Sequence, residues 1–329
     1  MKKLLLLLSL LLATNASAHS GDTGEHTHIF SQCETKEKID ILNQPPVPLK
    51  LNAPKYPRRA QERGIEGKVL VEYDVDVGGK VINPKVIWSE HEVFDSSALK
   101  TVSSWVFKPA LENGKPILSK GRIHTLTFLL EDSENTLNLG IAFDTIVREV
   151  QTGLRTGKVE KPIKKIDSLL ARKNLDEITR AGLLYLKASS LYRVEAPNEE
   201  IKSLLIESKQ HYEEKIVQFE GENVLVKSVT SMKLQSFGGI LLGQIYLDES
   251  SWEKAEEELT EAILASLDSG LKSQRFYQAY LQLGVATYYQ QKWCLAAKSW
   301  EKAKILSKEY QINFPEQLDE PFKYAQSKI

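Results

Sequence analysis

The chain has few cysteines and few long apolar stretches, and each shortage excludes a class of protein. Two cysteines in 329 residues exclude a disulfide-rich scaffold and the paired Cys-X-X-Cys arrangement of zinc and redox sites. Beyond residue 12, no segment is apolar enough to span a bilayer. The 43 basic and 44 acidic residues form no long block of one sign, which argues against a nucleic-acid-binding protein and against a polybasic membrane patch.

Catalytic motifs are also absent from the sequence. It contains no His-Glu-X-X-His, no Gly-X-Ser-X-Gly and no phosphate-binding glycine-rich loop. His91, His124 and His211 fall on unlike predicted elements, and the acidic residues at 256–258 fit the solvated face of a helix. We therefore expect no enzyme activity, no cofactor and no metal. An active site assembled from distant residues is the alternative.

Residues 1–18 have the organisation of a secretory signal peptide. Lys2 and Lys3 precede an apolar run at 4–12, and Ala16-Ser17-Ala18 supplies the small residues of a cleavage site. The run is about half of the ~20 residues that a membrane-spanning helix needs. We predict export with cleavage after Ala18; an uncleaved membrane anchor is the alternative. A lipoprotein is not indicated, because no cysteine lies at the boundary.

Residues 19–51 are predicted to form a flexible polar leader that ends in an extended, proline-containing approach to the next domain. The segment HSGDTGEHTH contains His19, His26 and His28, with acidic residues between them. Imidazole and carboxylate groups suit a divalent metal, so metal capture by a folded leader is the alternative to a flexible one.

Cys33 and Cys294 are the two cysteines. An oxidising compartment permits a bridge between them. Cys33 lies in the predicted leader and Cys294 in a predicted helix, and sequence alone cannot bring them within bonding distance. The sequence therefore favours two separate thiols and leaves a disulfide as the alternative.

Residues 52–132 carry the pattern of a small α+β domain. Hydrophobic and polar residues alternate through 69–77, apart from Leu70, which predicts a half-buried strand. Gly78-Gly79 predicts a tight turn into a returning strand at 80–88. A last strand is expected at 123–130.

Two helices are predicted to cover this sheet. The first, at 58–62, lies between Pro57 and Gly64. The second is capped by Asp95 or Ser96, and its apolar face is formed by Ala98, Val102, Trp105 and Val106. The domain is thus expected to be a small antiparallel sheet with two helices.

Two segments of this domain resemble the C-terminal domain of the TonB energy-transducer family. They are YPRRAQERGIEGKVLV at residues 56–71 and WVFKPALENGKP at residues 105–116. The resemblance implies a Gram-negative protein and therefore a periplasmic location. It also implies an interaction domain that binds a short segment of an outer-membrane transporter beside its last strand, where an extended peptide adds to the free strand edge.

The resemblance places the partner-binding edge at Ile123, Thr125, Thr127 and Leu129. The strand approach near the same partner would contain Ala53, Pro54 and Lys55. Well-known energy-transducing members have Gln where this chain has Ala53. The chain therefore departs from the family at a position that bears on transporter docking. The alternative is an edge covered by the following domain. Tyr56, Gly67, Trp105 and Pro109 are interpreted as structural.

From residue 133 to 329 the pattern becomes helical and contains an internal repeat. The first copy recurs 41 residues later. The copies are Leu242-Gly243, Trp252, Ala255, Leu259 and Ala262, and then Leu283-Gly284, Trp293, Ala296, Trp300 and Ala303. This spacing resembles the tetratricopeptide repeat, whose usual step is about 34 residues. Because two repeats rarely stand alone, upstream segments at 137–170 and 175–219 should form divergent helix pairs.

In that repeat family the first helix of each pair lines a peptide-binding groove. Transferring its positions to this chain gives Gln244, Asp248, Gln278, Leu281, Tyr288 and Tyr289 as groove candidates. Exposed tyrosines beside amides are suitable anchors for a peptide. Packing of Tyr288 and Tyr289 between helices is the alternative.

The predicted architecture is therefore a TonB C-terminal-like α+β domain followed by an all-α, TPR-like repeat domain. Energy transducers of the resembled family have an N-terminal membrane helix and a long proline-rich spacer, and both are missing here if the signal is cleaved. We predict a periplasmic, non-enzymatic adaptor; a membrane-anchored energy transducer is the alternative. Expected partners are envelope proteins, such as TonB-dependent outer-membrane receptors or TonB-system components, with no nucleic acid and no small-molecule substrate.

Overall fold

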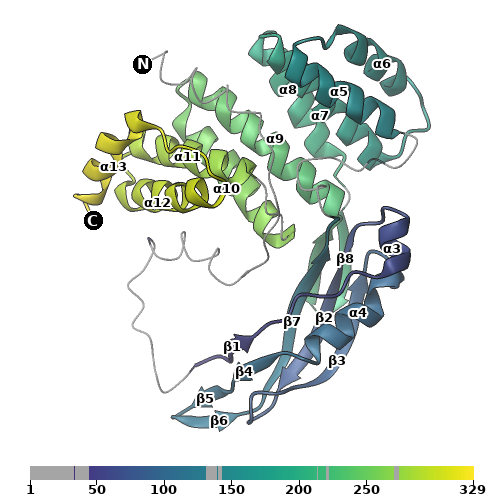
Figure 1. The fold of residues 1–329 in the computed structure, drawn as a ribbon, viewed down its shortest axis with the longest axis vertical. Coiled ribbons are helices and arrows are strands. Elements are labelled where there is room, and N and C mark those ends of the chain that lie inside the picture. The colour runs from purple at the N-terminus through teal and green to yellow at the C-terminus, as the bar shows by residue number, and fades with distance from the viewer. Residues whose placement is uncertain are drawn as a thin grey trace. The chain divides into compact units, whose positions relative to one another are not determined.

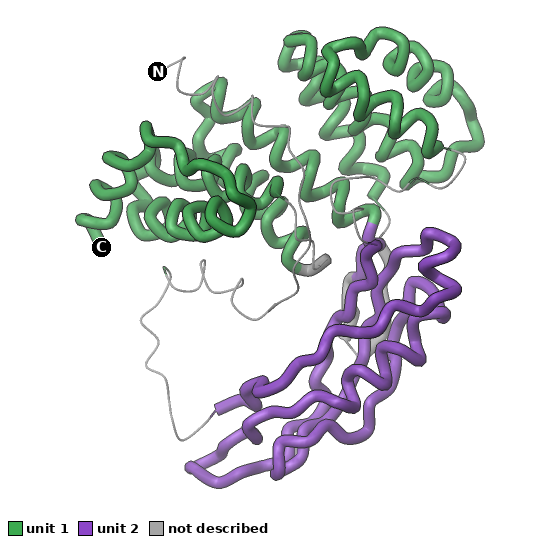
Figure 2. Tube along the Cα trace, in the orientation of Figure 1, with its two compact units in different colours: residues 1–35, 131–213, 230–329 green, residues 36–130, 214–229 purple. Residues whose placement is uncertain are grey.

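The computed structural model describes residue 33, residues 44–130, residue 139, and residues 143–212, 214–219, 222–269 and 274–329. The chain divides into two compact units (Figure 2). One consists of residues 36–130 and 214–229; the other consists of residues 1–35, 131–213 and 230–329. The predicted signal peptide and the three histidines of the leader lie outside the described residues.

The first unit contains a three-stranded antiparallel sheet (Figure 1). β2 (Gly67–Val75) lies in the centre, between β3 (Val81–Ser89) and β7 (Ser119–Phe128). Val69 is opposite Leu126, and Leu70 is opposite Thr125. The β2–β3 turn depends on Gly79, which has a φ of 81°. The alternating pattern thus correctly predicted a strand and the hairpin. The expectation of a half-buried strand is wrong, because every residue of β2 except Asp74 is buried.

One face of this sheet packs against the short helices α3 (Arg58–Glu62) and α4 (Asp95–Val102). The core between them is strongly apolar. Its fully buried members include Ala60, Val69, Val71, Val75, Phe94, Ala98 and Val102. Phe94 and Phe128 stack with ring centroids 4.3 Å apart. The α+β character expected from the sequence is confirmed.

The structure differs from the prediction around Trp105. α4 ends at Val102, where the hydroxyls of Ser103 and Ser104 donate to the carbonyls of Leu99 and Thr101 at 2.7 Å each. Val106 is therefore not helical and begins a strand. This strand is β4 (Val106–Lys108), and β5 (Ala110–Glu112) and β6 (Lys115–Ile117) follow it.

Part of the predicted leader belongs to the fold. β1 (Val47–Lys50) pairs antiparallel with β4, and Gln44 bridges to Leu111. The extended backbone that the prolines favour is therefore used for strand pairing, so ordered structure begins before residue 52.

The second unit is built from helices. They are α5 (Asp144–Thr156), α6 (Glu160–Leu170), α7 (Glu177–Arg193), α8 (Asn198–Gln210), α9 (Val229–Asp248), α10 (Trp252–Ser269), α11 (Arg275–Tyr289), α12 (Trp293–Glu309) and α13 (Asp319–Gln326). Among the helices of the described part of the chain, none combines the length and apolarity needed to cross a membrane. The helical character expected beyond residue 133 is confirmed.

The 41-residue repeat corresponds to a repeated contact. A Cβ atom added to Gly243 would lie 2.5 Å from the Leu259 side chain, and one added to Gly284 would lie 2.3 Å from Trp300. In both pairs the first helix, α9 or α11, approaches the second, α10 or α12, at a glycine that faces a large side chain. The sequence repeat is therefore a repeat of helix packing.

A second hairpin interrupts the helical series between α8 and α9. It consists of β8 (Glu214–Phe219) and β9 (Glu222–Lys227), which pair antiparallel. Sequence reasoning placed a helix through this segment. Val217 and Val224 are opposite one another in the hairpin, in a region rich in the β-branched residues that favour strands.

Cys33 and Cys294 form a disulfide, with Cα atoms 5.7 Å apart. The expectation of two separate thiols is therefore wrong. The bond joins residues that are 261 positions apart in the sequence, and only the fold brings the leader to α12.

Candidate functional site: a strand edge and a helical array

β7 is an edge strand of the three-stranded sheet. Its outer side pairs with no other strand among the described residues, and it pairs with β2 in unbroken register from Phe128 to Arg122. Of the predicted edge residues, Ile123 is 37% exposed, Thr125 and Thr127 are half-buried, and Leu129 lies one residue beyond the strand. The backbone of β7 is thus regular enough to accept an additional strand.

The opposite edge, β3, is irregular. Pro84 lies inside this strand and has no backbone N–H. The neighbouring Asn83 has a φ of 54°, and the β2–β3 register shifts at two places. Proline and bulges are features that protect an edge strand from pairing. The pairing with β2 is therefore continuous from Phe128 to Arg122 on β7 and interrupted on β3.

Asp74 holds both outer strands to β2 near the register shifts. Its carboxylate accepts a hydrogen bond from the Asn83 side chain and one from the Gly121 backbone N–H, at 3.0 Å each. These two bonds, with that from Asn83 contributing most, lower the pKa of Asp74. The start of β7 is thereby fixed relative to β3.

His124 lies on the core-facing side of β7, opposite Val71. Its ring packs against Trp105 at 4.7 Å in a T-shaped arrangement. Burial, and to a smaller extent the positive charge of Arg122, lower the pKa of His124. The neutral imidazole therefore forms part of the packing behind the edge strand.

The predicted strand approach is fixed along α4. The indole N–H of Trp105 donates to the Asn52 carbonyl at 3.0 Å, and the Ser97 hydroxyl donates to the Lys55 carbonyl. Between these anchors, Ala53 and Lys55 are exposed and Pro54 is half-buried. The Tyr56 hydroxyl donates to the Ile65 carbonyl at 2.6 Å, which supports a structural role for this tyrosine.

Two of the predicted groove residues are inaccessible. Gln244 is 2% exposed and Leu281 is 1% exposed. The Gln282 side chain donates to Gln244 at 2.7 Å, and Gln244 donates to Asp248 at 2.9 Å. Gln244 is thus part of an internal polar chain between α9 and α11. The Gln244 side chain is already hydrogen-bonded inside the array, and the Leu281 side chain is buried. Neither side chain is therefore available to line a groove.

The two tyrosines differ from each other. The Tyr288 ring packs 5.4 Å from Trp293 and 5.5 Å from Trp300, and is half-buried. Tyr289 stacks on Trp252 at 4.3 Å and is 43% exposed. Of the other candidates, Gln278 is half-buried and Asp248 is exposed. Of the six predicted groove residues, Asp248 and Tyr289 are therefore exposed, and Gln278 and Tyr288 are half-buried.

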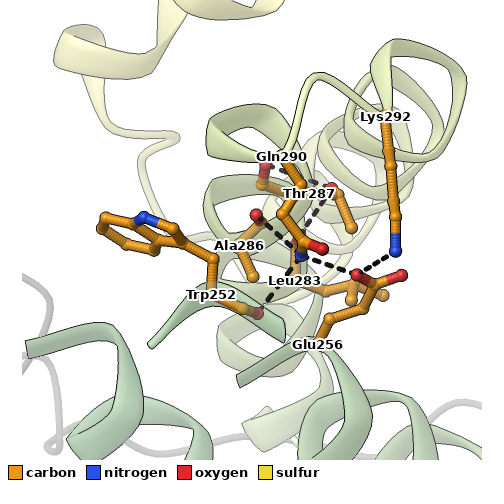
Figure 3. A network of polar contacts seen from close by, with 8 residues as sticks. Trp252, Glu256, Leu283, Ala286, Thr287, Gln290 and Lys292 are labelled. Atoms are coloured by element: carbon orange, nitrogen blue, oxygen red, sulfur yellow. Dashed lines mark hydrogen bonds and ion pairs between the residues drawn. The ribbon is translucent and has the colours of Figure 1, made fainter. Parts of the chain in front are cut away.

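A polar clasp joins successive helix pairs, as Figure 3 shows. Gln290, at the end of α11, donates to the Trp252 carbonyl at 3.2 Å and to Glu256 at 2.6 Å. Glu256 also pairs with Lys292 at 2.6 Å. The beginning of α10 is thus bonded to the end of α11.

A similar clasp, made by different polar groups, occurs one step earlier. Glu249 lies 41 positions before Gln290 and accepts from Asn198 at 3.2 Å and from Lys202 at 2.9 Å. Asn198 begins α8 as Trp252 begins α10, and Lys202 occupies the position of Glu256, four residues later. The beginning of α8 is thus bonded to the end of α9, as the beginning of α10 is to the end of α11. Sequence reasoning missed the clasp because the bonding groups change type between copies.

Within the described residues, no group of three His, Cys, Asp or Glu side chains is placed to hold a metal ion. The histidine-rich part of the leader lies outside those residues. Two features of the described residues remain as candidate sites: the β7 edge, which pairs with no second strand there, and the helical array.

Comparison with known proteins finds similarity in the segment that contains the three-stranded sheet. Residues 52–128 match the family model of the Gram-negative bacterial TonB protein C-terminal. The TonB protein of Vibrio cholerae is 36% identical over 103 residues, which are 31% of this chain and 41% of that protein. The TonB protein of Pseudomonas aeruginosa is 36% identical over 69 residues, 21% of this chain and 20% of that protein. The chain thus spans less than half the length of these relatives.

Among solved structures, the chain is similar to the solution NMR structure of Pseudomonas aeruginosa TonB CTD. The identity is 31%, with 26% of this chain and 88% of that chain covered and a TM-score of 0.24. On the sequence match, residues 52–128 are similar to the C-terminal domain of TonB proteins. The array from α5 to α13 lies outside the matched residues.

Proposed function

We propose that the chain is a periplasmic adaptor that binds one partner by strand addition at β7 and a second partner through its helical array. The observation that carries this proposal is the contrast between the two edges of the sheet. β7 pairs with β2 in unbroken register from Phe128 to Arg122, whereas β3 contains Pro84 and its pairing with β2 has two register shifts. Main-chain hydrogen bonds at such an edge supply affinity, and alternate side chains supply selectivity.

The first partner in this proposal is an extended segment of an envelope protein, with TonB-dependent outer-membrane receptors or TonB-system components as the leading class. The domain match at 52–128 supports this class. Ala53 stands where well-known transducers have Gln, so we propose that the contact relies on the β7 backbone more than on the approach segment.

The second surface is proposed to be a tetratricopeptide-like array. Its support is the glycine contact, which repeats with a step of 41 residues, and the clasp, whose members Glu249 and Gln290 are also 41 residues apart. Solenoids of stacked helix pairs commonly offer extended binding surfaces. Tyr289, which is 43% exposed, is the most accessible aromatic anchor among the predicted groove residues.

Position-specific photo-cross-linking tests the strand-addition mode. Benzoylphenylalanine would replace Ile123 on β7 in one variant and Lys85 on β3 in a matched control, and synthetic N-terminal segments of outer-membrane receptors would be added. The proposal predicts a cross-linked product from position 123 and none from position 85. Equal products from both positions, or a product from position 85 alone, would reject addition at β7.

A further inference from the structure

On the face of the sheet that points away from the helices, the central strand β2 is buried, although it contributes charged residues to that face. Lys68, Leu70 and Glu72 alternate with the core residues of β2 and therefore point to this second face. They are only 5%, 5% and 9% exposed, respectively. An antiparallel sheet with helices on one face normally leaves its other face to solvent. Another part of the chain must therefore cover this one.

The register of the sheet extends this second face over all three strands. Leu70 lies opposite Trp88 on β3 and opposite Thr125 on β7. Glu72 lies opposite Ile123 and pairs with Lys85 at 2.5 Å. The face thus has an apolar centre formed by Leu70 and Trp88, with charged groups beside it, and such a mixture suits a covered surface better than an open one.

The β8–β9 hairpin belongs to the same compact unit as the sheet, and Figure 2 gives residues 214–229 the colour of that unit. The end of this segment is buried, with Val226 3% and Val229 2% exposed. The Val229 N–H, at the first residue of α9, donates to the Glu90 carboxylate at 3.2 Å, directly beyond the end of β3. An acidic acceptor at a helix N-terminus is favourable.

The spacing of the helix pairs shows that this hairpin is an insertion. α10 and α12 begin at Trp252 and Trp293, 41 positions apart. α8 begins at Asn198, so the preceding step to Trp252 is thirteen residues longer. The hairpin occupies residues 214–227 and has nearly the length of this excess. The helical array repeats without the hairpin, and the hairpin belongs to the unit of the sheet. We therefore look for its role in that unit.

We propose that the β8–β9 hairpin is an intramolecular partner of the second face of the sheet. It forms an additional β layer over Lys68, Leu70 and Glu72, and connects the TonB-family domain to α8 and α9. It also denies this apolar face to a second copy of the chain and to other proteins. Partner strands then have access to the sheet only at the β7 edge. This role follows from the burial of the second face and from the spacing of the helix pairs, and it does not depend on which partner binds β7.

Lysine acetylation read by mass spectrometry tests the covering directly. A variant would replace residues 214–227 with a short Gly-Ser link, which restores a step close to 41 residues. In the intact chain Lys68 should react far more slowly than Lys100, an exposed residue on α4. In the variant Lys68 should react at a rate close to that of Lys100, with unchanged helical circular dichroism. Unchanged protection of Lys68 in a variant with native helices would overturn the proposal.

A second measurement uses the intact chain and does not depend on the deletion. Benzoylphenylalanine in place of Thr125, a second-face position of β7, should cross-link within the molecule to the peptide that contains residues 214–227. A cross-link to any other segment of the chain would overturn the proposal. Light scattering on the deletion variant should show self-association through the uncovered face. A deletion variant that stays monomeric and keeps Lys68 protected would also contradict the covering of this face by the hairpin.

Discussion

Gly284 lies directly against the indole of Trp300, so that a Cβ atom on the glycine would stand 2.3 Å from Nε1. We predict that Gly284→Ala destabilises the helical array by about 1–3 kcal/mol, because α11 and α12 must separate to admit one methyl group. Urea unfolding followed by circular dichroism measures this change.

Gly238→Ala, in α9, is the matched control for this substitution. The nearest atom to a Cβ at Gly238 is 3.5 Å away, so the methyl group fits. Alanine also favours a helix over glycine by up to about 1 kcal/mol. We expect Gly238→Ala to be neutral or stabilising. If both variants lose the same stability, close packing at Gly284 is not the reason.

Gly79 should be the most sensitive turn position of the TonB-family domain. Its φ is 81°, and a Cβ atom would lie 1.9 Å from the Phe107 carbonyl oxygen. Gly79→Ala should cost at least about 2 kcal/mol in thermal unfolding, since backbone strain and a backbone clash add. At Gly64 the φ is 64° and no atom lies within 4 Å of an added Cβ. Gly64→Ala should therefore introduce backbone strain without a clash and lower the stability by about 1 kcal/mol.

His124 predicts a pH dependence of stability. Burial lowers its pKa below the usual histidine value of 6.5 in the folded domain, so the unfolded chain binds more protons between the two pKa values. Stability should therefore be full above pH 6.5, fall as the pH drops below it, and level off below the folded pKa. Thermal unfolding between neutral and mildly acidic pH measures this slope. His124→Gln should flatten it, and an unchanged slope would show that another group is responsible.

The disulfide between Cys33 and Cys294 should stabilise the protein by restricting its unfolded chain. The bond spans 261 positions, and loops of that size contribute up to about 5 kcal/mol. The double variant Cys33→Ser/Cys294→Ser should unfold at lower denaturant concentration than the oxidised protein. Dithiothreitol should lower the stability of the wild type and leave the double variant unaffected. Two titratable thiols in the unreduced, denatured protein would contradict the bond.

Patterns of short range allowed much of the fold to be predicted. The spacing of nearby residues predicts local structure directly. This applies to the alternation along β2, to the turn at Gly79 and to the glycine contacts of the repeat. The helix through Trp105 was predicted wrongly, because the apolar face extended past Val102 while two serine hydroxyls ended the helix. Apolar spacing alone does not show where such side chains cap the backbone.

The other differences involve long-range contacts. The Cys33–Cys294 bond, the pairing of β1 with β4 and the place of the β8–β9 hairpin all join segments far apart in the chain. For the candidate site, the edge residues Ile123, Thr125 and Thr127 were predicted within β7. Gln244 and Leu281 were predicted at a surface yet are buried. The position of a residue within one repeat does not show whether the neighbouring helix pair packs against it.

Amide hydrogen exchange of the whole chain, with and without a receptor N-terminal peptide, tests strand addition at β7 most directly. The account predicts that backbone amides of residues 123–127 exchange more slowly when the peptide is bound, while those of 85–88 on β3 stay unchanged. Protection on β3, or protection confined to the helical array, would contradict it.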